Sequence, residues 1–429
     1  MNDTWKATRL RFLLDAPLTY GATESGIEFD VNLPRYIRIT DIRADGRLEP
    51  ENVVSLPYET ARPYLLKDGD VLLARSGATV GKAFLYQADS GEACFAGYLI
   101  RARCHRQRIL PEYLSYFLQS ASYWDFINRS ALQATIQNVS AEVYKEVSVT
   151  HPSTDRQAAV VTYLDEQTEK IDRLMDMRRQ QMSLLKEQRS ALIQQAVTRG
   201  LNPNVPMKDS GLPWLGEIPE HWSTVQLGRL AALLQTGPFG SQLHAHEYVE
   251  DGIPIINPSH MAEGLIQYDP KYTVDTATAR RLNRHVLQVE DIVFARRGEL
   301  GRCVLVRDQE SGYLCGTGSM LMRPDTRILN SAYLVTLFQI KHLKESLTLR
   351  SVGSTMDNLN TSILSQTGLP LPPLKEQSKI LSFIEEQRTK FDILHAAYDR
   401  QLTLLTEYRA ALIHECVTGQ RLIPEDASL

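Results

Sequence analysis

The sequence predicts a mixed α+β protein that is built twice, with two globular α/β domains separated by two long, antiparallel coiled-coil helices. The first observation is an internal repeat, in which the run Leu164–Asp172 returns as Ile384–Asp392 at an offset of 220 (384 minus 164). A period of this length indicates a duplicated domain with its connector, because solenoid units are only tens of residues long. The second observation is the length of 429 residues, which exceeds what one hydrophobic core normally serves.

In each half, a globular domain is followed by a helix. We expect a first globular domain at 1–150, a first helix at 151–200, a linker at 201–221, a second globular domain at 222–370, a second helix at 371–420 and a tail at 421–429. The helical segments match closely, whereas the globular segments share only landmarks such as Gly69–Gly77, which returns as Glu290–Gly298. The repeat therefore indicates a common helical scaffold that carries two domains free to differ.

Each helical segment carries one apolar stripe. Between Pro152 and Gly200 there is no internal proline or glycine, and the apolar residues are spaced by three, four and seven positions, which is typical of one helix face. The residues that we expect to pair the helices are Leu164, Ile171, Leu174, Leu185 and Leu192 in the first helix, and Ile384, Phe391, Leu394, Leu405 and Leu412 in the second. Because the same frame recurs in both, we favour pairing over two unrelated core helices.

The length of these helices favours an antiparallel pair. A helix of about 44 residues would be roughly 65 Å long, so a small domain alone cannot cover its stripe, whereas a second helix can. The proline-containing linker spans at most about 70 Å when fully extended, and a parallel pair would need nearly all of that reach. We therefore predict antiparallel helices and a pseudo-twofold relation between the halves.

Composition narrows the class of protein. An apolar fraction of 43% with 23% charged residues is ordinary for a globular protein, and no apolar run is long enough to span a bilayer. The start of the chain is too weakly apolar for a secretory signal, and the five cysteines form no C-x-x-C pair, so we predict a cytoplasmic protein without a metal site. The net charge of −4 argues against generic electrostatic binding of nucleic acid. DNA binding would have to rely on local basic clusters and specific contacts.

Several motifs together resemble the specificity (S) subunits of type I restriction-modification systems. They are the Gly69–Gly77 type of turn in duplicate, the proline-then-helix junctions from His151 to Gln157 and from Leu371 to Gln377, and the linker run Asp209–Trp222. Trp5 resembles the matching entry to the first domain, although the proline-rich lead-in is absent there. Each motif is weak alone, but their order and duplication are specific.

This resemblance implies a DNA-binding protein of host defence. Each globular domain would be a target-recognition domain for one half of a split, asymmetric double-stranded DNA site, and the helices would fix the gap and dock two modification (methyltransferase) subunits. Restriction subunits would complete the nuclease. S-adenosylmethionine, ATP and Mg²⁺ are expected on those partner subunits, with no cofactor on this chain and no membrane partner.

Arginines supply the candidate DNA contacts. Arg75 with Ser76, and Arg296 with Arg297, follow apolar strand-like runs and precede glycine, so they are expected on exposed turns where arginine can reach phosphate or guanine. The denser clusters are Arg101, Arg103, Arg106 and Arg108 in the first domain, and Arg280, Arg281 and Arg284 in the second. The alternative is that the turn arginines pair with local carboxylates and that the clusters are solvated faces.

Amides in two expected loops are weaker candidates. Gln137 with Asn138, and Asn358 with Asn360, could read adenine. Because Asn138 and Asn358 correspond at the repeat offset, we favour a structural role in a shared turn.

The sequence lacks motifs for chemistry. Ser76–Ala83 is the nearest approach to an ATP-binding loop, but serine replaces its first glycine and alanine replaces the metal-binding hydroxyl. Asn257–His260 is the nearest approach to a methyltransferase motif and lacks its second proline. We therefore predict no catalytic residue and a non-catalytic recognition subunit. The alternatives are a DNA methyltransferase with an unrecognised site and a coiled-coil scaffold for proteins only.

Overall fold

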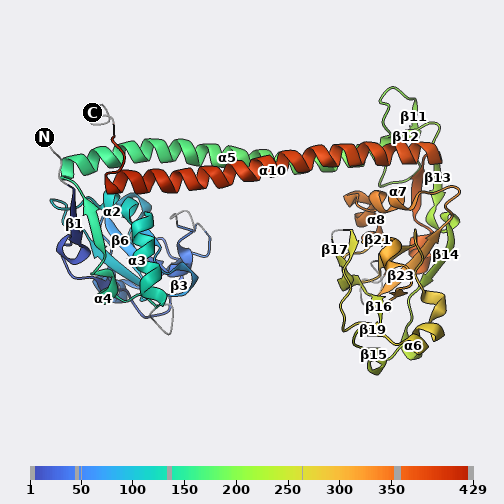
Figure 1. Cartoon of the computed structure of the whole chain (residues 1–429), viewed down its shortest axis with the longest axis horizontal. Coiled ribbons are helices and arrows are strands. Elements are labelled where there is room, and N and C mark those ends of the chain that lie inside the picture. The colour runs from blue at the N-terminus through green and yellow to red at the C-terminus, as the bar shows by residue number, and fades with distance from the viewer. Residues whose placement is uncertain are drawn as a thin grey trace. The chain divides into compact units, whose positions relative to one another are not determined.

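The computed structural model describes residues 5–43, 48–49, 51–132, 138–262, 264–351 and 359–423. The chain forms two compact units, of which unit 1 contains Met1–Gln180 with Ala397–Leu429, and unit 2 contains Gln181–Ala396. Each unit therefore holds one globular domain together with part of both long helices (Figure 1).

The globular domain of unit 1 contains two four-stranded sheets. The antiparallel sheet has the order β2 (Thr19–Tyr20), β9 (Leu99–Arg103), β6 (Asp70–Ala74) and β7 (Ala83–Leu85). The mixed sheet has the order β3 (Ile27–Glu28), β5 (Val54–Ser55), β4 (Arg35–Ile37) and β8 (Ala93–Phe95), in which β4 and β8 are parallel. β6 is buried throughout because Val71 and Leu73 enter one hydrophobic cluster while Leu72 and Ala74 enter another.

Helices and one strand pair complete this domain. They are α1 (Tyr58–Ala61), α2 (Pro111–Phe117), α3 (Ala121–Leu132) and α4 (Ala141–Tyr144), with β1 (Lys6–Arg9) antiparallel to β10 (Ser148–His151). α2 packs against both β6 and β10. Because β10 leads directly into the first long helix, α2 and β10 connect the domain to that helix.

The globular domain of unit 2 repeats this architecture. Its antiparallel sheet has the order β14 (Ala231–Thr236), β23 (Ser319–Pro324), β20 (Ile292–Ala295) and β21 (Cys303–Leu305). Its second sheet has the order β15 (Tyr248–Val249), β19 (Thr273–Val274), β16 (Ile253–Ile256) and β22 (Leu314–Cys315), again with one parallel pair, β16 and β22. The remaining elements are β13 (Ser223–Gln226) paired with β24 (Gly368–Leu371), β17 (Met261–Ala262) paired with β18 (Leu265–Ile266), α6 (Thr276–Arg281), α7 (Ser331–Leu337), α8 (Lys341–Ser351) and α9 (Thr361–Ser365).

The segment between the halves is more ordered than a plain linker. It contains the hairpin of β11 (Met207–Asp209) and β12 (Glu217–Pro219). The hairpin packs on the globular domain of unit 2, where the Thr224 hydroxyl donates to Ser210 O at 3.0 Å. Leu212 lies close to Gly368, where an added Cβ would be 2.4 Å from the leucine Cδ2 and the leucine side chain would have to shift.

The two long helices are α5 (Thr154–Arg199) and α10 (Leu374–Thr418). They end at Gly200 and Gly419, which both have a left-handed φ of 76°, a conformation that glycine adopts at helix ends without strain. The absence of internal proline and glycine explains their length.

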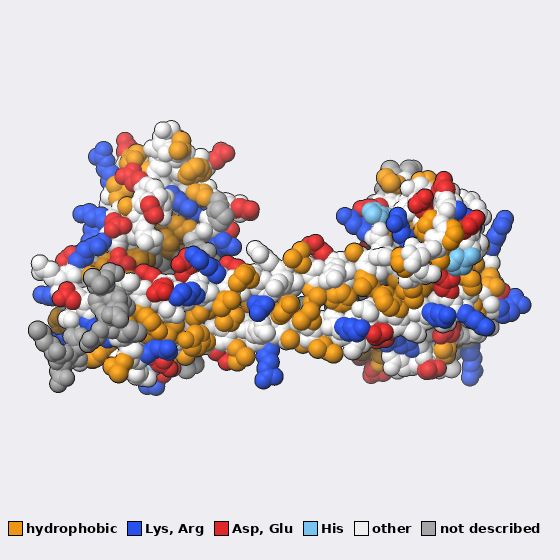
Figure 2. Space-filling model, turned by 90° about the horizontal axis from the view of Figure 1, so that it is seen from above, with side chains coloured by type: hydrophobic (Ala, Val, Ile, Leu, Met, Phe, Trp, Pro, Cys, Tyr) orange, Lys and Arg blue, Asp and Glu red, His pale blue; other side chains and the backbone are white. Residues whose placement is uncertain are grey.

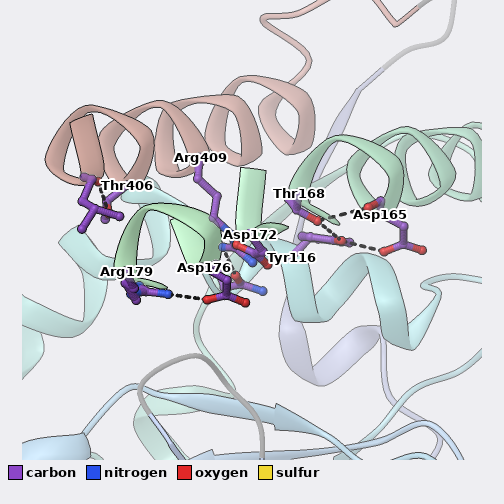
Figure 3. Close-up of polar contacts among 10 residues, drawn as sticks. Tyr116, Asp165, Thr168, Asp172, Asp176, Arg179, Thr406 and Arg409 are labelled. Atoms are coloured by element: carbon purple, nitrogen blue, oxygen red, sulfur yellow. Dashed lines mark hydrogen bonds and ion pairs between the residues drawn. The ribbon is translucent and has the colours of Figure 1, made fainter. Parts of the chain in front are cut away.

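The helices run antiparallel within each unit. In unit 1 the first half of α5 lies against the last part of α10, where Arg409 Nε donates to Asp172 Oδ1 at 3.0 Å (Figure 3). In unit 2 the corresponding residues Arg189 and Asp392 form an ion pair at 3.4 Å. The predicted fold class, two globular domains with paired long helices in a duplicated plan, is confirmed.

The predicted pairing residues differ in burial. Leu164, Ile171, Ile384 and Leu412 are buried, whereas Leu185, Leu192, Phe391 and Leu405 are half-buried. Leu174 and Leu394 are 42% and 39% exposed, which is more than a buried stripe requires. The difference arises because two helices alone leave the flanks of their contact in water.

Candidate nucleic-acid interface

The turn after β6 holds Arg75 in a defined position. β6 ends at Ala74, and Gly77 has a left-handed φ of 73° with open space around it, which lets the chain reverse toward β7. The Arg75 N–H donates to Tyr98 O at 3.1 Å, and the Val139 N–H donates to Arg75 O at 2.8 Å. Two neighbouring segments therefore fix the backbone of this turn.

The Arg75 side chain lies on an aromatic ring. Its guanidinium carbon is 4.7 Å from the ring centroid of Tyr20, and its Nε donates to Asn138 Oδ1 at 3.3 Å. In the part of the chain that the structure describes, no hydrogen bond engages its terminal nitrogens. A stacked guanidinium keeps its outer edge available for partners that accept two hydrogen bonds, such as phosphate or guanine. Arg75 and the adjacent half-buried Ser76 lie on a turn as expected, and their contact with DNA stays a prediction.

The second domain has the same turn with different side chains. After β20, the Arg296 N–H donates to Gly318 O at 3.0 Å, and the Leu359 N–H donates to Arg296 O at 2.9 Å. Arg296 is half-buried, and this burial, followed by the neighbouring Arg297 charge, lowers its pKa. Arg297 is exposed, and Gly298 has a left-handed φ of 76°. One backbone frame thus carries Arg-Ser in one domain and Arg-Arg in the other.

Two arginines of the first predicted cluster, Arg101 and Arg103, have partners within the domain, and their contact with DNA stays a prediction. Arg103 binds the buried Asp70 with both branches of its guanidinium, from Nε to Oδ1 at 2.7 Å and from Nη2 to Oδ2 at 2.6 Å. This hydrogen bonding raises the pKa of Arg103, and its donor fork is already occupied. Arg101 is half-buried, donates to Leu65 O at 3.3 Å and lies 5.4 Å from the Phe95 ring centroid.

The same buried pair occurs in the second domain, where the sequence analysis did not identify it. Arg323 donates to both oxygens of the buried Asp291, from Nε to Oδ1 and from Nη2 to Oδ2, each at 2.8 Å. Because each pair joins a strand start to its neighbouring strand, it fixes the sheet that carries the arginine turn.

The other arginines of the first cluster lie at the surface. Arg106 forms an exposed ion pair with Asp68 at 3.1 Å, and Arg108 donates to Phe12 O at 2.8 Å. Exposed ion pairs contribute little to stability. Arg106 can therefore exchange its present partner for phosphate at small cost.

In the second domain, the predicted cluster lies on and just after α6. Arg281 pairs with Glu247 and donates to Gln242 O at 2.6 Å, and Arg284 donates to Gln235 Oε1 at 3.4 Å. The hydrogen bond from the His244 N–H lowers the pKa of Glu247, and the positive charge of Arg281 lowers it further. Arg280, Arg281 and Arg284 are all exposed, so their contact with DNA stays a prediction.

The two candidate amides that the structure describes, Asn138 and Asn360, both make contacts within the domain. Asn138 holds Arg75, as described above, and Asn360 caps α9 by accepting a hydrogen bond from the Ile363 N–H at 2.8 Å. Gln137 and Asn358 lie outside the described residues. Sequence reasoning missed Tyr20 and the 62% exposed Tyr98 beside Arg75, because only the fold brings these segments together.

The described residues offer little for chemistry. Among them, no group of three or more histidine, cysteine or acidic residues is placed to hold a metal ion. All five cysteines are buried, and burial raises the pKa of Cys94, Cys104 and Cys303 to about 12, so these thiols stay protonated. None of the described helices has the length and apolar character needed to cross a bilayer.

The fold has relatives among solved structures. The chain is similar to a solved chain of a type I restriction-modification system, with a TM-score of 0.70 and 16% sequence identity, over 98% of this chain and 99% of that one. This similarity defines the class of fold, a duplicated two-domain protein with paired long helices.

Sequence comparisons point to the same class of protein. Residues 219–404 match the family model described as type I restriction modification DNA specificity domain. The chain is 21% identical to the MjaVIII specificity subunit of Methanocaldococcus jannaschii, over 81% of this chain and 80% of the relative. It is 22% identical to the StySPI specificity subunit of Salmonella potsdam, over 90% and 81% respectively.

The family model over residues 219–404 and the relatives over most of the chain support a specificity subunit of a type I restriction-modification system. The resemblance stated from the sequence is thereby confirmed. Because its relatives are the specificity subunits of their systems, the prediction of a non-catalytic chain is confirmed as well. The alternatives of a methyltransferase and of a scaffold for proteins only are not favoured.

Proposed function

We propose that this chain is the subunit through which a type I restriction-modification complex recognises its DNA sequence, with each globular domain reading one half of a bipartite, asymmetric site. The observation that carries the proposal is the repeated arginine turn. Arg75 and Ser76 in one domain, and Arg296 and Arg297 in the other, occupy one backbone frame with different side chains. Because the two turns have the same backbone hydrogen bonds but carry different side chains, we expect the two domains to recognise different base sequences.

The burial of the arginines separates those that stabilise the sheets from those that are available to contact DNA. Arg103 and Arg323 hold each sheet through buried carboxylates. The exposed candidates for DNA contact are Arg106, Arg108, Arg280, Arg281, Arg284 and Arg297, together with the half-buried Arg75. With a net charge of −4, the chain depends on such local groups rather than on a general positive field.

The helices support docking of two equal partners. Figure 2 shows hydrophobic side chains gathered over the paired helices. Leu174 and Leu404 are exposed in unit 1, and the residues that match them at the repeat offset, Leu394 and Leu184, are exposed in unit 2. Two matching apolar surfaces fit two copies of one protein, which we propose are the modification subunits. Restriction subunits then join, and these partners supply the sites for S-adenosylmethionine, ATP and Mg²⁺. A complex that acts on cellular DNA places the chain in the cytoplasm.

A domain exchange tests the proposal. Residues 1–150 are replaced with the matching domain of another specificity subunit, the chain is expressed with its modification subunits, and methylated positions are mapped across the genome. We expect one half of the methylated sequence to change, while exchange of residues 222–370 changes the other half. A change of both halves by either exchange would contradict independent reading domains.

A further inference from the structure

A buried glutamine connects the globular domain of unit 1 to α5. Gln157, in the first turns of α5, is fully buried. Its Oε1 accepts from the Leu110 N–H at 2.8 Å, just before α2, and its Nε2 donates to Arg108 O and Pro152 O, both at 3.0 Å. One carboxamide therefore joins the start of α2 to the start of α5 with its acceptor and both donors engaged.

A buried tyrosine connects the same domain to the other helix. Tyr113 lies on α2 and is fully buried, and its hydroxyl is 2.9 Å from Val417 O, in the last turn of α10. The last carbonyls of a helix have no partner within the helix, so a buried donor there satisfies an otherwise open group. The same hydroxyl is 3.0 Å from Thr150 O in β10. α2 is thus held to the start of one long helix and the end of the other.

Unit 2 repeats both contacts. Gln377 Oε1 accepts from the Asn330 N–H at 2.8 Å, and its Nε2 donates to Ile328 O at 3.0 Å and Pro372 O at 2.9 Å. The buried Tyr333 hydroxyl donates to Val197 O at 3.0 Å. Every partner in this set corresponds to its counterpart in unit 1 at an offset of 220.

The repetition of these contacts is informative because the amino-acid sequences of the two globular domains otherwise agree only at scattered landmarks. Side chains that read different half-sites should differ between the domains, whereas side chains that position the domains should be the same. Gln157 and Gln377, like Tyr113 and Tyr333, are also fully buried and cannot touch DNA.

We propose that Gln157 with Tyr113, and Gln377 with Tyr333, form a domain clamp that fixes the orientation of each recognition domain on its helix ends and thereby restricts the gap that the complex accepts between half-sites. This inference rests on the proposed function. The four side chains are positioning residues. A carboxamide with all three bonds engaged is satisfied in one orientation only, and a tilt of the domain leaves buried polar groups without partners.

The main experiment measures gap tolerance. The full chain with Gln157→Met and Tyr113→Phe is assembled with its modification subunits, and methylation is measured on DNAs whose gap is native, one base pair longer or one base pair shorter. We expect the preference for the native gap to fall about tenfold, the factor that corresponds to one net buried hydrogen bond, with both half-site sequences still required. The exposed Gln180→Met on α5 is the matched control and should keep the native preference.

A simple loss of stability gives a different result. It lowers methylation on all three DNAs in parallel and leaves the gap preference unchanged, and this outcome would overturn the clamp. If the double variant does not fold, Tyr113→Phe alone, which removes only one hydroxyl, is measured on the same DNAs. A weaker gap preference would then support the clamp, and a parallel loss of methylation on all three DNAs would overturn it.

A second measurement separates the clamp from the proposed function, because it needs no DNA. In hydrogen exchange on the isolated chain, Gln157→Met should speed exchange of the Leu110 amide about tenfold and leave that of Asn330 unchanged. Gln377→Met should do the reverse. Unchanged exchange at both amides refutes the clamp whatever the complex methylates. Faster exchange in a chain whose assembled complex shows no sequence preference would refute the proposed function and leave the clamp standing.

Discussion

Replacing Arg103 decides whether this arginine holds the sheet or binds DNA. Arg103→Met removes two hydrogen bonds of 2.7 and 2.6 Å to Asp70, a carboxylate that is 1% exposed. Among the described residues, the Lys67 N–H at 2.8 Å remains as a donor to it. Breaking a buried pair in this way costs about 3–5 kcal/mol. Because the arginine side chain is 25% exposed, we expect the lower end, about 3 kcal/mol.

Calorimetry of the full chain measures the effect. For units of this size, about 3 kcal/mol lowers the Tm by about 6–12 °C, and the transition affected should be that of unit 1. Arg323→Met is the matched variant and should lower the Tm of unit 2 instead. Arg106→Met should cost under about 1 kcal/mol, because its ion pair with Asp68 is exposed on both sides. An Arg103→Met chain that keeps its Tm but loses DNA affinity would refute the structural role.

Three further outcomes are expected. Gly419→Ala should destabilise unit 1 by about 2 kcal/mol or more in urea unfolding, because the φ of Gly419 is 76° and an added Cβ would lie 2.4 Å from Trp5. Gly77→Ala is the control and should cost about 1 kcal/mol, because Gly77 has a similar φ of 73° but open space around it. Arg297→Met should weaken DNA binding by the assembled complex by about 1–3 kcal/mol without moving the Tm of unit 2; full affinity at several salt concentrations would exclude a contact. Burial raises the pKa of Cys94, Cys104 and Cys303 to about 12, so iodoacetamide should label these thiols at pH 8 only after unfolding, and rapid labelling of the folded chain would contradict this. The free energy of unfolding should fall from about pH 9 toward pH 12, because in this range the thiols ionise in the unfolded chain but stay protonated in the folded one.

The long helices could be predicted because their signals are local. Apolar spacing, the absence of proline and glycine, and the terminal Gly200 and Gly419 all lie within or next to α5 and α10. Burial along the stripe was less predictable. Leu174 and Leu185 have the same place in the pattern as Ile171, but their exposure depends on how many neighbours the fold brings to each point along the helices.

The candidate site was only partly predictable because its decisive contacts are non-local. The sequence indicates that Arg75 lies on a turn, but Tyr20 reaches it only through the pairing of β2, β9 and β6. Arg103 and Arg106 look equivalent in the sequence. The register of β6 against β9 places Asp70 opposite Arg103, and this pairing gives the two arginines different roles.

The division of the chain has a consequence for its synthesis. Unit 1 is assembled from the first 180 residues and the last 33 (397 to 429), and unit 2 lies between them. On the ribosome, unit 2 can therefore finish folding first, although unit 1 begins to emerge earlier. Until Leu412, Ile413 and Val417 are translated, the hydrophobic cluster of unit 1 lacks these buried residues. A chain that stops after residue 396 would contain all of unit 2 and an incomplete unit 1 with part of its hydrophobic cluster exposed, a form that proteases can degrade.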